Sequence, residues 1–348
     1  MVTIFLLILY FHLCLGGISW RPIGFDAHMA LGSWRFFLAL LVALSHLWDG
    51  MIHGPAAYAV WGFFLISGFL MTWVLRTRYS DGWGGLRDYA FNRFLRIYPA
   101  YYLACLLGLV ALVVMPLQGV NPALLNGQFV MPQNWRDWAT NIGLLPIWGA
   151  GHLLVPVSGA LGVEVGVYLL LPLMARAPSV AWLGLILSAM LNWQHGIETQ
   201  TFAVRYSLFL TSFMAFAVGA LVAHYKASLQ RWHAPWLSSL TWLAHCLIWL
   251  RWDQWPWNWG LYFSLLLTAW VLVSFADRKS NALDRWLGDL SYPLYLFHTV
   301  MAVWWFGLFG MQRSLSFMLA GLVSTLALSW LVIVLIDRPL EKRFKRRR

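Results

Sequence analysis

The chain has 348 residues, of which 61% are hydrophobic and 11% are charged, and its formal net charge is +11. Soluble proteins have about twice this charged fraction, so the composition excludes an ordinary soluble globular protein. The positive charge does not indicate nucleic-acid binding, because the basic residues lie in short connecting segments and in the tail EKRFKRRR, as the positive-inside rule predicts for a membrane protein. The three cysteines lack metal-binding or redox spacing, and we expect no metal site.

Apolar runs of bilayer length recur along the chain and predict an all-α, polytopic membrane protein with about ten transmembrane helices. An even number of spans places both termini on one side of the membrane. With ten spans, four of the 24 lysines and arginines fall on the other side, namely Arg136, Arg205, Arg251 and Arg313. We therefore expect a multi-pass protein of the cell inner (plasma) membrane with cytoplasmic N and C termini. In chain order, the ten runs lie near residues 34–50, 58–76, 95–116, 158–174, 180–194, 203–224, 236–250, 258–276, 290–310 and 315–336.

The pattern predicts three regions: an N-terminal apolar or interfacial segment over residues 1–33, a transmembrane domain over residues 30–340 and a basic cytoplasmic tail over residues 341–348. Residues 4–18 are apolar but short, and no basic residue precedes them, so they make a poor signal peptide. They form either a helix on the membrane surface or an eleventh span, unless translation starts at Met29.

Two features are expected on the outer side of the membrane. Residues 117–157 form a long loop whose part WRDWATNIGLLPIWG (135–149) has an amphipathic pattern, which predicts a re-entrant or interfacial piece. Many of the 24 tryptophans lie near predicted helix ends, as in RWDQWPWNWG (251–260). This position is typical of anchors at the membrane interface, and the alternative is a Trp-lined sugar site.

Few ionisable residues lie inside the predicted spans, where such groups are costly and usually functional. Glu164 is the acid well inside a span, the embedded histidines are His46, His245 and His298, and Arg35 lies at the inner mouth of the first span. Arg35 and His46 are eleven residues apart, close to three helical turns, so they share a helix face about 16 Å apart. His46 is either a functional imidazole or a packing residue bonded to a neighbouring helix, and we interpret His245 as packing.

Arg93 and Arg96 are three residues apart and also share a helix face. Forked guanidinium groups suit phosphates, so this pair predicts an anion clamp, and the alternative is that both residues only orient the protein in the membrane. Glu164 has Tyr168 one turn further along its helix. A carboxyl in lipid is protonated or paired, and we expect His46 as its partner because both lie toward the outer ends of their helices. Such a carboxylate would set the tautomer of the imidazole and make it a better general base.

Six motifs follow one another in the order RFFLALLVALSHLW (35–48), GFFLISGFLMT (62–72), NRFLRIYPAYYLA (92–104), VEVGVYLLLP (163–172), LGDLSYPLYLFH (287–298) and DRPLEKRF (337–344). In this order they resemble the motifs of the acyltransferase-3 family of integral membrane acyltransferases, over nearly the whole chain. The departures are Gly159, Ala160 and Val165, where the family often has Trp-Ser and a second acid, and Trp61, where many members have Asp or Gly. They weaken any assignment of the acceptor but not of the core chemistry.

The resemblance implies transfer of an acyl group, usually acetyl from acetyl-CoA, to a hydroxyl of a cell-envelope or exported glycan or of a lipid-linked sugar. Arg35, Arg93 and Arg96 would hold the phosphates of cytoplasmic acetyl-CoA. His46, oriented by Glu164, would act as the general base or would carry the acetyl group itself. The residues expected to line the substrate channel are Ser67, Tyr168, Ser291, Tyr295 and His298, of which Ser291 and His298 alternatively support the structure.

The expected partners are membrane lipid and the glycan or lipid-linked acceptor, with no nucleic acid. A separate periplasmic partner is a further option, because some family members pass the acetyl group to a fused periplasmic domain and this chain ends twelve residues after its last predicted span. The oligomeric state stays open. The alternative function is a glycan-precursor transporter or flippase, against which the absence of internal sequence repeats argues.

Overall fold

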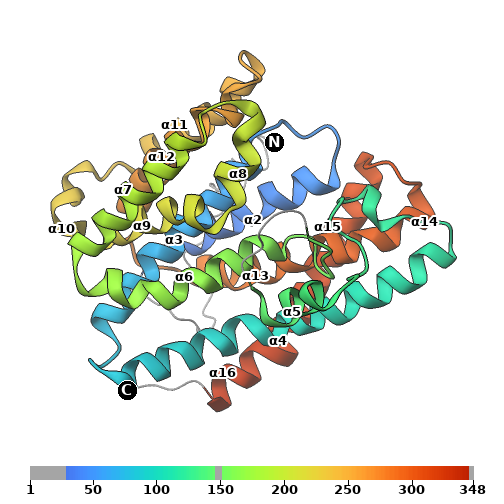
Figure 1. Cartoon of the computed structure of the whole chain (residues 1–348), viewed down its shortest axis with the longest axis horizontal. Coiled ribbons are helices and arrows are strands. Elements are labelled where there is room, and N and C mark those ends of the chain that lie inside the picture. The colour runs from blue at the N-terminus through green and yellow to red at the C-terminus, as the bar shows by residue number, and fades with distance from the viewer. Residues whose placement is uncertain (1–28, 146–150, 345–348) are drawn as a thin grey trace.

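The computed structural model describes residues 29–145 and 151–344, so the apolar segment 4–18 and the end of the basic tail lie outside the described residues. Every regular element in these two ranges is helical and none is a strand, which confirms the all-α prediction (Figure 1). The longer helices are α2 (Gly32–Leu47), α3 (Pro55–Thr77), α4 (Trp83–Leu117), α6 (Ser158–Arg176), α7 (Pro178–Gln194), α9 (Phe209–His224), α11 (Pro235–Leu247), α12 (Gly260–Phe275), α13 (Ala282–Ala302) and α15 (Leu315–Val332). The shorter ones are α5 (Trp135–Gly143), α8 (Phe202–Ser207), α10 (Lys226–Leu229), α14 (Phe306–Phe309), α16 (Arg338–Phe344) and the π-helical η7 (Ile333–Asp337), with 3₁₀ turns between several of them.

Among the described residues, five helices are long and apolar enough to cross a membrane, or six if the bent pair Thr199–Ser207 and Phe209–His224 is one span. The predicted number of about ten spans is therefore not confirmed. All ten apolar runs coincide with helical residues, but several of these helices are shorter than the roughly 20 residues that a crossing needs. Helices α2 and α12, for example, have 16 residues each. An apolar run in a sequence includes the turns at the ends of its helix, and this makes the helix look longer than it is.

Helices α2 and α13 pack side by side and run in the same direction. Their first turns touch through backbone, because a Cβ atom on Gly32 would lie 1.8 Å from the carbonyl oxygen of Asp284. The Asp284 carboxylate accepts a hydrogen bond from the backbone N–H of Ser33 at 2.7 Å and so caps the N-terminus of α2. At the other end of the pair, His46 of α2 meets His298 of α13. We call the end with Gly32 and Asp284 the basic end, and the end with His46 and His298 the histidine end.

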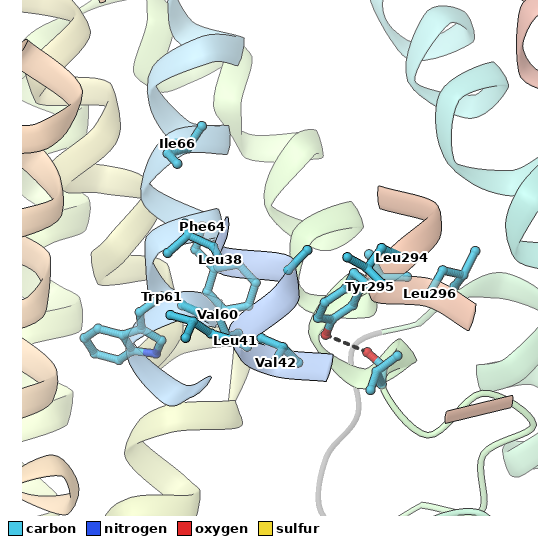
Figure 2. Packing of buried hydrophobic residues seen from close by; sticks show 14 of the residues in the cluster. Leu38, Leu41, Val42, Val60, Trp61, Phe64, Ile66, Leu294, Tyr295 and Leu296 are labelled. Atoms are coloured by element: carbon cyan, nitrogen blue, oxygen red, sulfur yellow. Dashed lines mark hydrogen bonds between the residues drawn. The ribbon is translucent and has the colours of Figure 1, made fainter. Parts of the chain in front are cut away.

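Helix α3 runs back along α2 and completes the apolar core with α2 and α13. Figure 2 shows Leu38 of α2 beside Val60 and Phe64 of α3, with Tyr295 of α13 across from them, and all four side chains are buried. Helix α9 covers another side of α3, where the ring of Phe64 stacks on that of Phe216 with centroids 4.7 Å apart. This packing holds α2 between α3 and α13 and so decides which helix His46 faces.

The segment between α4 and α6 folds back along α4 instead of extending beyond its end. The hydroxyl groups of Tyr98, Tyr101 and Tyr102, near the middle of α4, donate to the last carbonyl oxygens of α5. These tyrosines precede Leu117, the last residue of α4, by roughly 22–28 Å of helix at a rise of about 1.5 Å per residue. Figure 1 accordingly shows α5 beside the middle of α4. That this segment is a re-entrant or interfacial piece stays a prediction.

Candidate active site

A pocket opens at the basic end between α2, α3, α4, α6 and α13, and we call it the arginine pocket. Arg35 of α2 and both Arg93 and Arg96 of α4 line it. The structure thus brings together the three residues that the sequence assigns to one anionic ligand. Glu164 and four of the five expected channel residues, Ser67, Tyr168, Ser291 and Tyr295, line the same pocket.

Glu164 is held by two hydroxyl groups at the edge of the arginine pocket. Its Oε1 atom accepts a hydrogen bond from Ser67 Oγ at 2.5 Å and another from the hydroxyl of Tyr168, one turn along α6. The expected pairing of Glu164 with His46 is therefore wrong, since no hydrogen bond joins the two within the described parts of the chain. The physical reason is depth: Glu164 contacts Ser67 and lines the pocket at the basic end, whereas His46 lies at the histidine end.

His46 is paired instead with His298, the fifth expected channel residue. Its Nδ1 atom lies 2.8 Å from His298 Nε2. The ring centroids are 5.1 Å apart and the ring planes differ by 4°. When two imidazole nitrogens are 2.8 Å apart, a centroid separation of 5.1 Å is about the largest possible, and it is reached only when the two rings point at each other. The rings therefore lie edge to edge in nearly one plane. His298 is fully buried whereas His46 is partly exposed, so His46 is the more accessible of the two imidazoles.

Tyr295 stands between the arginine pocket and the histidine pair. It lines the pocket, and its ring centroid lies 6.2 Å from that of His298. Its hydroxyl donates to the carbonyl oxygen of Val157 at 3.0 Å (Figure 2), and its ring packs edge-on against Phe63 at 6.0 Å. Neither histidine lines the arginine pocket. A ligand that extends from this pocket to His46 therefore passes beside Tyr295.

The arginine pocket also carries acidic groups that were not expected from the sequence. Asp284, Arg285 and Asp289 of α13 line it together with Glu341. The apolar run begins at residue 290, whereas α13 begins at Ala282, so the hydropathy pattern by itself puts these charges in a loop. The sequence feature that could have revealed these charges is an Asp-Arg pair, followed one helical turn later by a second Asp, just before a long apolar run. The pocket is thus a site of mixed charge rather than a purely basic clamp.

Several of these charges are engaged in contacts that shape the pocket wall. The Asp284 carboxylate, besides capping α2, accepts a hydrogen bond from the Ser280 hydroxyl at 2.6 Å. Arg96 lies 3.9 Å from Asp337 of η7, and its guanidinium carbon is 5.9 Å from the centre of the Tyr292 ring. The oxygens of Asp337 have no hydrogen-bond partner among the described residues. Arg96 is therefore oriented by an ion pair and an aromatic face rather than by a fixed hydrogen bond.

A second pocket lies at the histidine end, and we call it the aromatic pocket. Its wall includes Ser45, which directly precedes His46, and an ion pair between Asp49 and Arg313 whose closest atoms are 2.6 Å apart. Arg313 also donates to the His46 carbonyl oxygen at 3.5 Å. The pocket thus adjoins the turn of α2 that carries His46. Its aromatic lining residues are Trp48, Phe202, Tyr206 and Trp257.

The remaining embedded histidine has a packing role, as expected. His245 is buried, and its Nε2 atom donates to the carbonyl oxygen of Gly260 at 2.9 Å. Its ring packs against the ring of Tyr58 with centroids 4.7 Å apart. It lines neither of the two pockets.

Comparison with known proteins agrees with the order of the motifs. A family model described as an acyltransferase domain, that of the acyltransferase-3 family, matches residues 5–334. No protein of curated function and no solved structure matches the chain significantly. Because the family model covers nearly all of the chain, and because the structure contains apolar helices of bilayer length, the protein belongs to the acyltransferase-3 family and is a membrane acyltransferase.

Proposed function

We propose that the protein moves an acetyl group from cytoplasmic acetyl-CoA to a hydroxyl of a cell-envelope or exported glycan, presented as the glycan itself or as a lipid-linked sugar. The observation that carries this proposal is the position of His46. The arginine pocket lies toward the basic end of the α2–α13 pair and the aromatic pocket toward the histidine end. His46 lies beside the aromatic pocket, because Ser45 and Arg313 line that pocket and Arg313 contacts the His46 carbonyl oxygen.

The donor is proposed to bind in the arginine pocket. Acetyl-CoA carries several phosphates, and planar guanidinium groups bind phosphate oxygens through paired hydrogen bonds. Arg35, Arg93 and Arg96 line one pocket at the basic end, and the excess of basic residues argues that this end faces the cytoplasm of the inner membrane. The pocket continues along apolar side chains such as Val60 and Phe63, which suit an extended pantetheine arm that carries the thioester toward Tyr295.

The acceptor is proposed to bind in the aromatic pocket. Sugar-binding sites combine aromatic surfaces with a few fixed polar groups that set the orientation of the ligand. Trp48 and Trp257 supply the surfaces, and the ion-paired Asp49 supplies a hydrogen-bond acceptor for hydroxyl groups. The two tryptophans that line this pocket are thus assigned to a sugar site, which was the alternative to anchors at the membrane interface. The acceptor is the glycan or lipid-linked sugar itself, or a separate periplasmic partner that takes up the acetyl group.

The chemistry needs one base between the two ligands. His46 removes the proton of the acceptor hydroxyl as the oxygen attacks the thioester carbonyl carbon. The new C–O bond forms, the C–S bond breaks, and the CoA thiolate leaves and takes up the proton from the imidazolium. A two-step relay through acetyl-His46 uses the same residues and the same proton balance.

The test uses membranes that contain the protein, with acetyl-CoA labelled in its acetyl group. Free CoA is measured with a thiol reagent, and acetylated glycans extracted from the same membranes are measured by mass spectrometry. We expect CoA release and glycan acetylation to rise together and to depend on added glycan. Matched membranes with His46→Ala at equal protein level are the control. Wild-type membranes that show neither CoA release nor labelled glycan would overturn the proposal.

A further inference from the structure

We propose that His298 is a positioning residue that fixes the tautomer of His46, so that Nε2 of His46 is the atom that takes up the proton. The catalytic meaning of this inference rests on the proposed function, while the tautomer itself follows from the hydrogen bonds alone. It replaces the carboxylate that the sequence suggested for this task with a second, neutral imidazole.

The tautomers follow from the backbone of α13. His298 Nδ1 lies 2.7 Å from the carbonyl oxygen of Tyr295 and 3.3 Å from that of Leu294. A carbonyl oxygen only accepts hydrogen bonds, so the proton of a neutral His298 sits on Nδ1. Its Nε2 atom then carries a lone pair and accepts. The neighbouring Nδ1 of His46, 2.8 Å away, must therefore be the donor. A neutral His46 with its proton on Nδ1 has a free lone pair on Nε2.

The arrangement of the rings makes this hydrogen bond a strong directional restraint. Because the two rings lie edge to edge within 4° of one plane, the N–H of His46 points along the lone pair of His298. His298 is itself locked, since it is fully buried on α13 and bonded to the backbone one turn below. His46 is thus held in a single ring orientation as well as a single tautomer, the two conditions that a general base must meet.

The same hydrogen bonds allow the positive charge that forms on His46 during the reaction to be shared with His298. When Nε2 of His46 accepts the hydroxyl proton, the proton on its Nδ1 can shift to Nε2 of His298. The imidazolium charge is then shared with a ring whose Nδ1–H points at two carbonyl oxygens. No proton is gained or lost in this shift, and it reverses when the CoA thiolate is protonated. His298 therefore does the orienting work that an aspartate does in a Ser-His-Asp triad.

The first test compares two substitutions at one position. His298→Leu removes the acceptor, and we expect kcat to fall ~10²–10⁴-fold, as for a base held in the wrong tautomer, with little change in the KM for acetyl-CoA. His298→Gln places an amide oxygen close to the position of Nε2, where it can accept from His46, and should restore most of the loss. His245→Leu is the matched control, because it also deletes a buried imidazole bonded to a backbone carbonyl but lies outside both pockets.

Provided that the variants are folded and inserted in the membrane, three kinetic outcomes would overturn the proposal. These are near-normal kcat in His298→Leu, an equal loss in His298→Leu and His298→Gln, and a loss of the same size in His245→Leu.

The second test reads the tautomer without any activity. Protein labelled with ¹⁵N-histidine is examined by NMR in detergent, and the His46 signals are identified by their absence in His46→Gln. We expect the shift of a protonated Nδ1 and an unprotonated Nε2 in the wild type, and averaging of the two tautomers in His298→Leu. A protonated Nε2 in neutral wild-type His46 would overturn the inference. If wild-type membranes transfer no acetyl group but the expected tautomer is found, the proposed function fails and the positioning role stands.

Discussion

His46 Nδ1 lies 2.8 Å from His298 Nε2, although 252 residues separate the two histidines along the chain. The contact exists because α2 and α13 run in the same direction from a backbone contact at Gly32 and Asp284. It joins the first and the fifth of the six motifs at one point of the fold. The residue that orients the proposed base therefore comes from α13 rather than from α6, and this changes which substitutions should act as a unit.

His46→Ala should abolish most of the acetyl transfer while leaving the protein inserted. The remainder of α2 is apolar and packed, so the helix tolerates the loss of one partly exposed imidazole. We expect activity to fall by the ~10²–10⁴-fold that is typical of a lost general base. Acetylated product is measured in matched membranes at equal protein level, with His195→Ala, an exposed histidine, as the control. Near-normal activity in His46→Ala would make His46 a packing residue.

Arg93→Ala and Arg96→Ala should weaken donor binding. Loss of one or two charge-assisted hydrogen bonds to phosphate predicts a ~10–100-fold rise in the KM for acetyl-CoA. Arg93→Lys should be only partly active, because an ammonium group lacks the planar fork. Arg87→Ala is the matched control, since its side chain is 59% exposed and lies outside the pocket on the same helix. An unchanged KM in the double variant Arg93→Ala/Arg96→Ala would leave these arginines as orientation signals only.

Glu164 should be coupled energetically to Ser67 and not to His46. Groups in direct contact usually show coupling energies of ~0.5–3 kcal/mol, whereas distant groups are additive within ~0.5 kcal/mol. We therefore expect a non-additive cycle for Glu164→Gln with Ser67→Ala and an additive cycle for Glu164→Gln with His46→Ala. The cycles are measured as ratios of kcat/KM at equal protein level. The reverse pattern would mean that the hydroxyl contacts of Glu164 have no role in the active protein.

Trp257→Ala should impair use of the acceptor without affecting the donor. Trp257 lines the aromatic pocket, and its carbonyl oxygen is held by the fully buried Arg205 at 2.6 Å. Its ring packs edge-on against Phe202 with centroids 5.0 Å apart, so both its backbone and its indole are held in the pocket wall. We expect a higher KM for the glycan and an unchanged KM for acetyl-CoA. Trp83→Ala is the control, because that side chain is 82% exposed at the start of α4. Equal effects of the two substitutions would reduce Trp257 to an interface anchor.

The segment around α5 should lose stability in acid when Asp137 becomes protonated. The backbone N–H of Gln133 and the Nδ1 atom of His152 donate to this carboxylate at 2.9 and 2.8 Å, and these hydrogen bonds lower the pKa of Asp137. A lowered folded pKa adds stability that is present above the unfolded pKa, near 3.9, and is lost as the pH falls through the folded pKa.

We expect faster amide hydrogen exchange over residues 133–145 and 151–154 at about pH 3 than at about pH 5, after correction for the intrinsic exchange rate. Asp137→Asn should show the faster exchange already at about pH 5. Equal protection of the wild type and the variant under both conditions would show that the carboxylate does not hold this segment.

Much of the architecture and of the arginine pocket could be predicted from the sequence. The apolar runs determine an all-α membrane protein, because a chain in lipid must satisfy its own backbone hydrogen bonds. The helical repeat places Arg93 and Arg96 on one face, and the order of the six motifs predicts the family. These are local properties or properties of order along the chain, and neither depends on which helices touch.

Only the tertiary structure decided which helices are neighbours and how each one is rotated. His298 is the partner of His46 because α2 touches α13 at Gly32 and because α3 lies between α2 and α6. Neither contact can be predicted from the spacing of residues along the chain. The charges of Asp284 and Asp289 belong to the pocket because α13 starts before its apolar run. Hydropathy and periodicity describe one helix at a time, whereas the site is made where five helices pack together, and packing is a property of all of them at once.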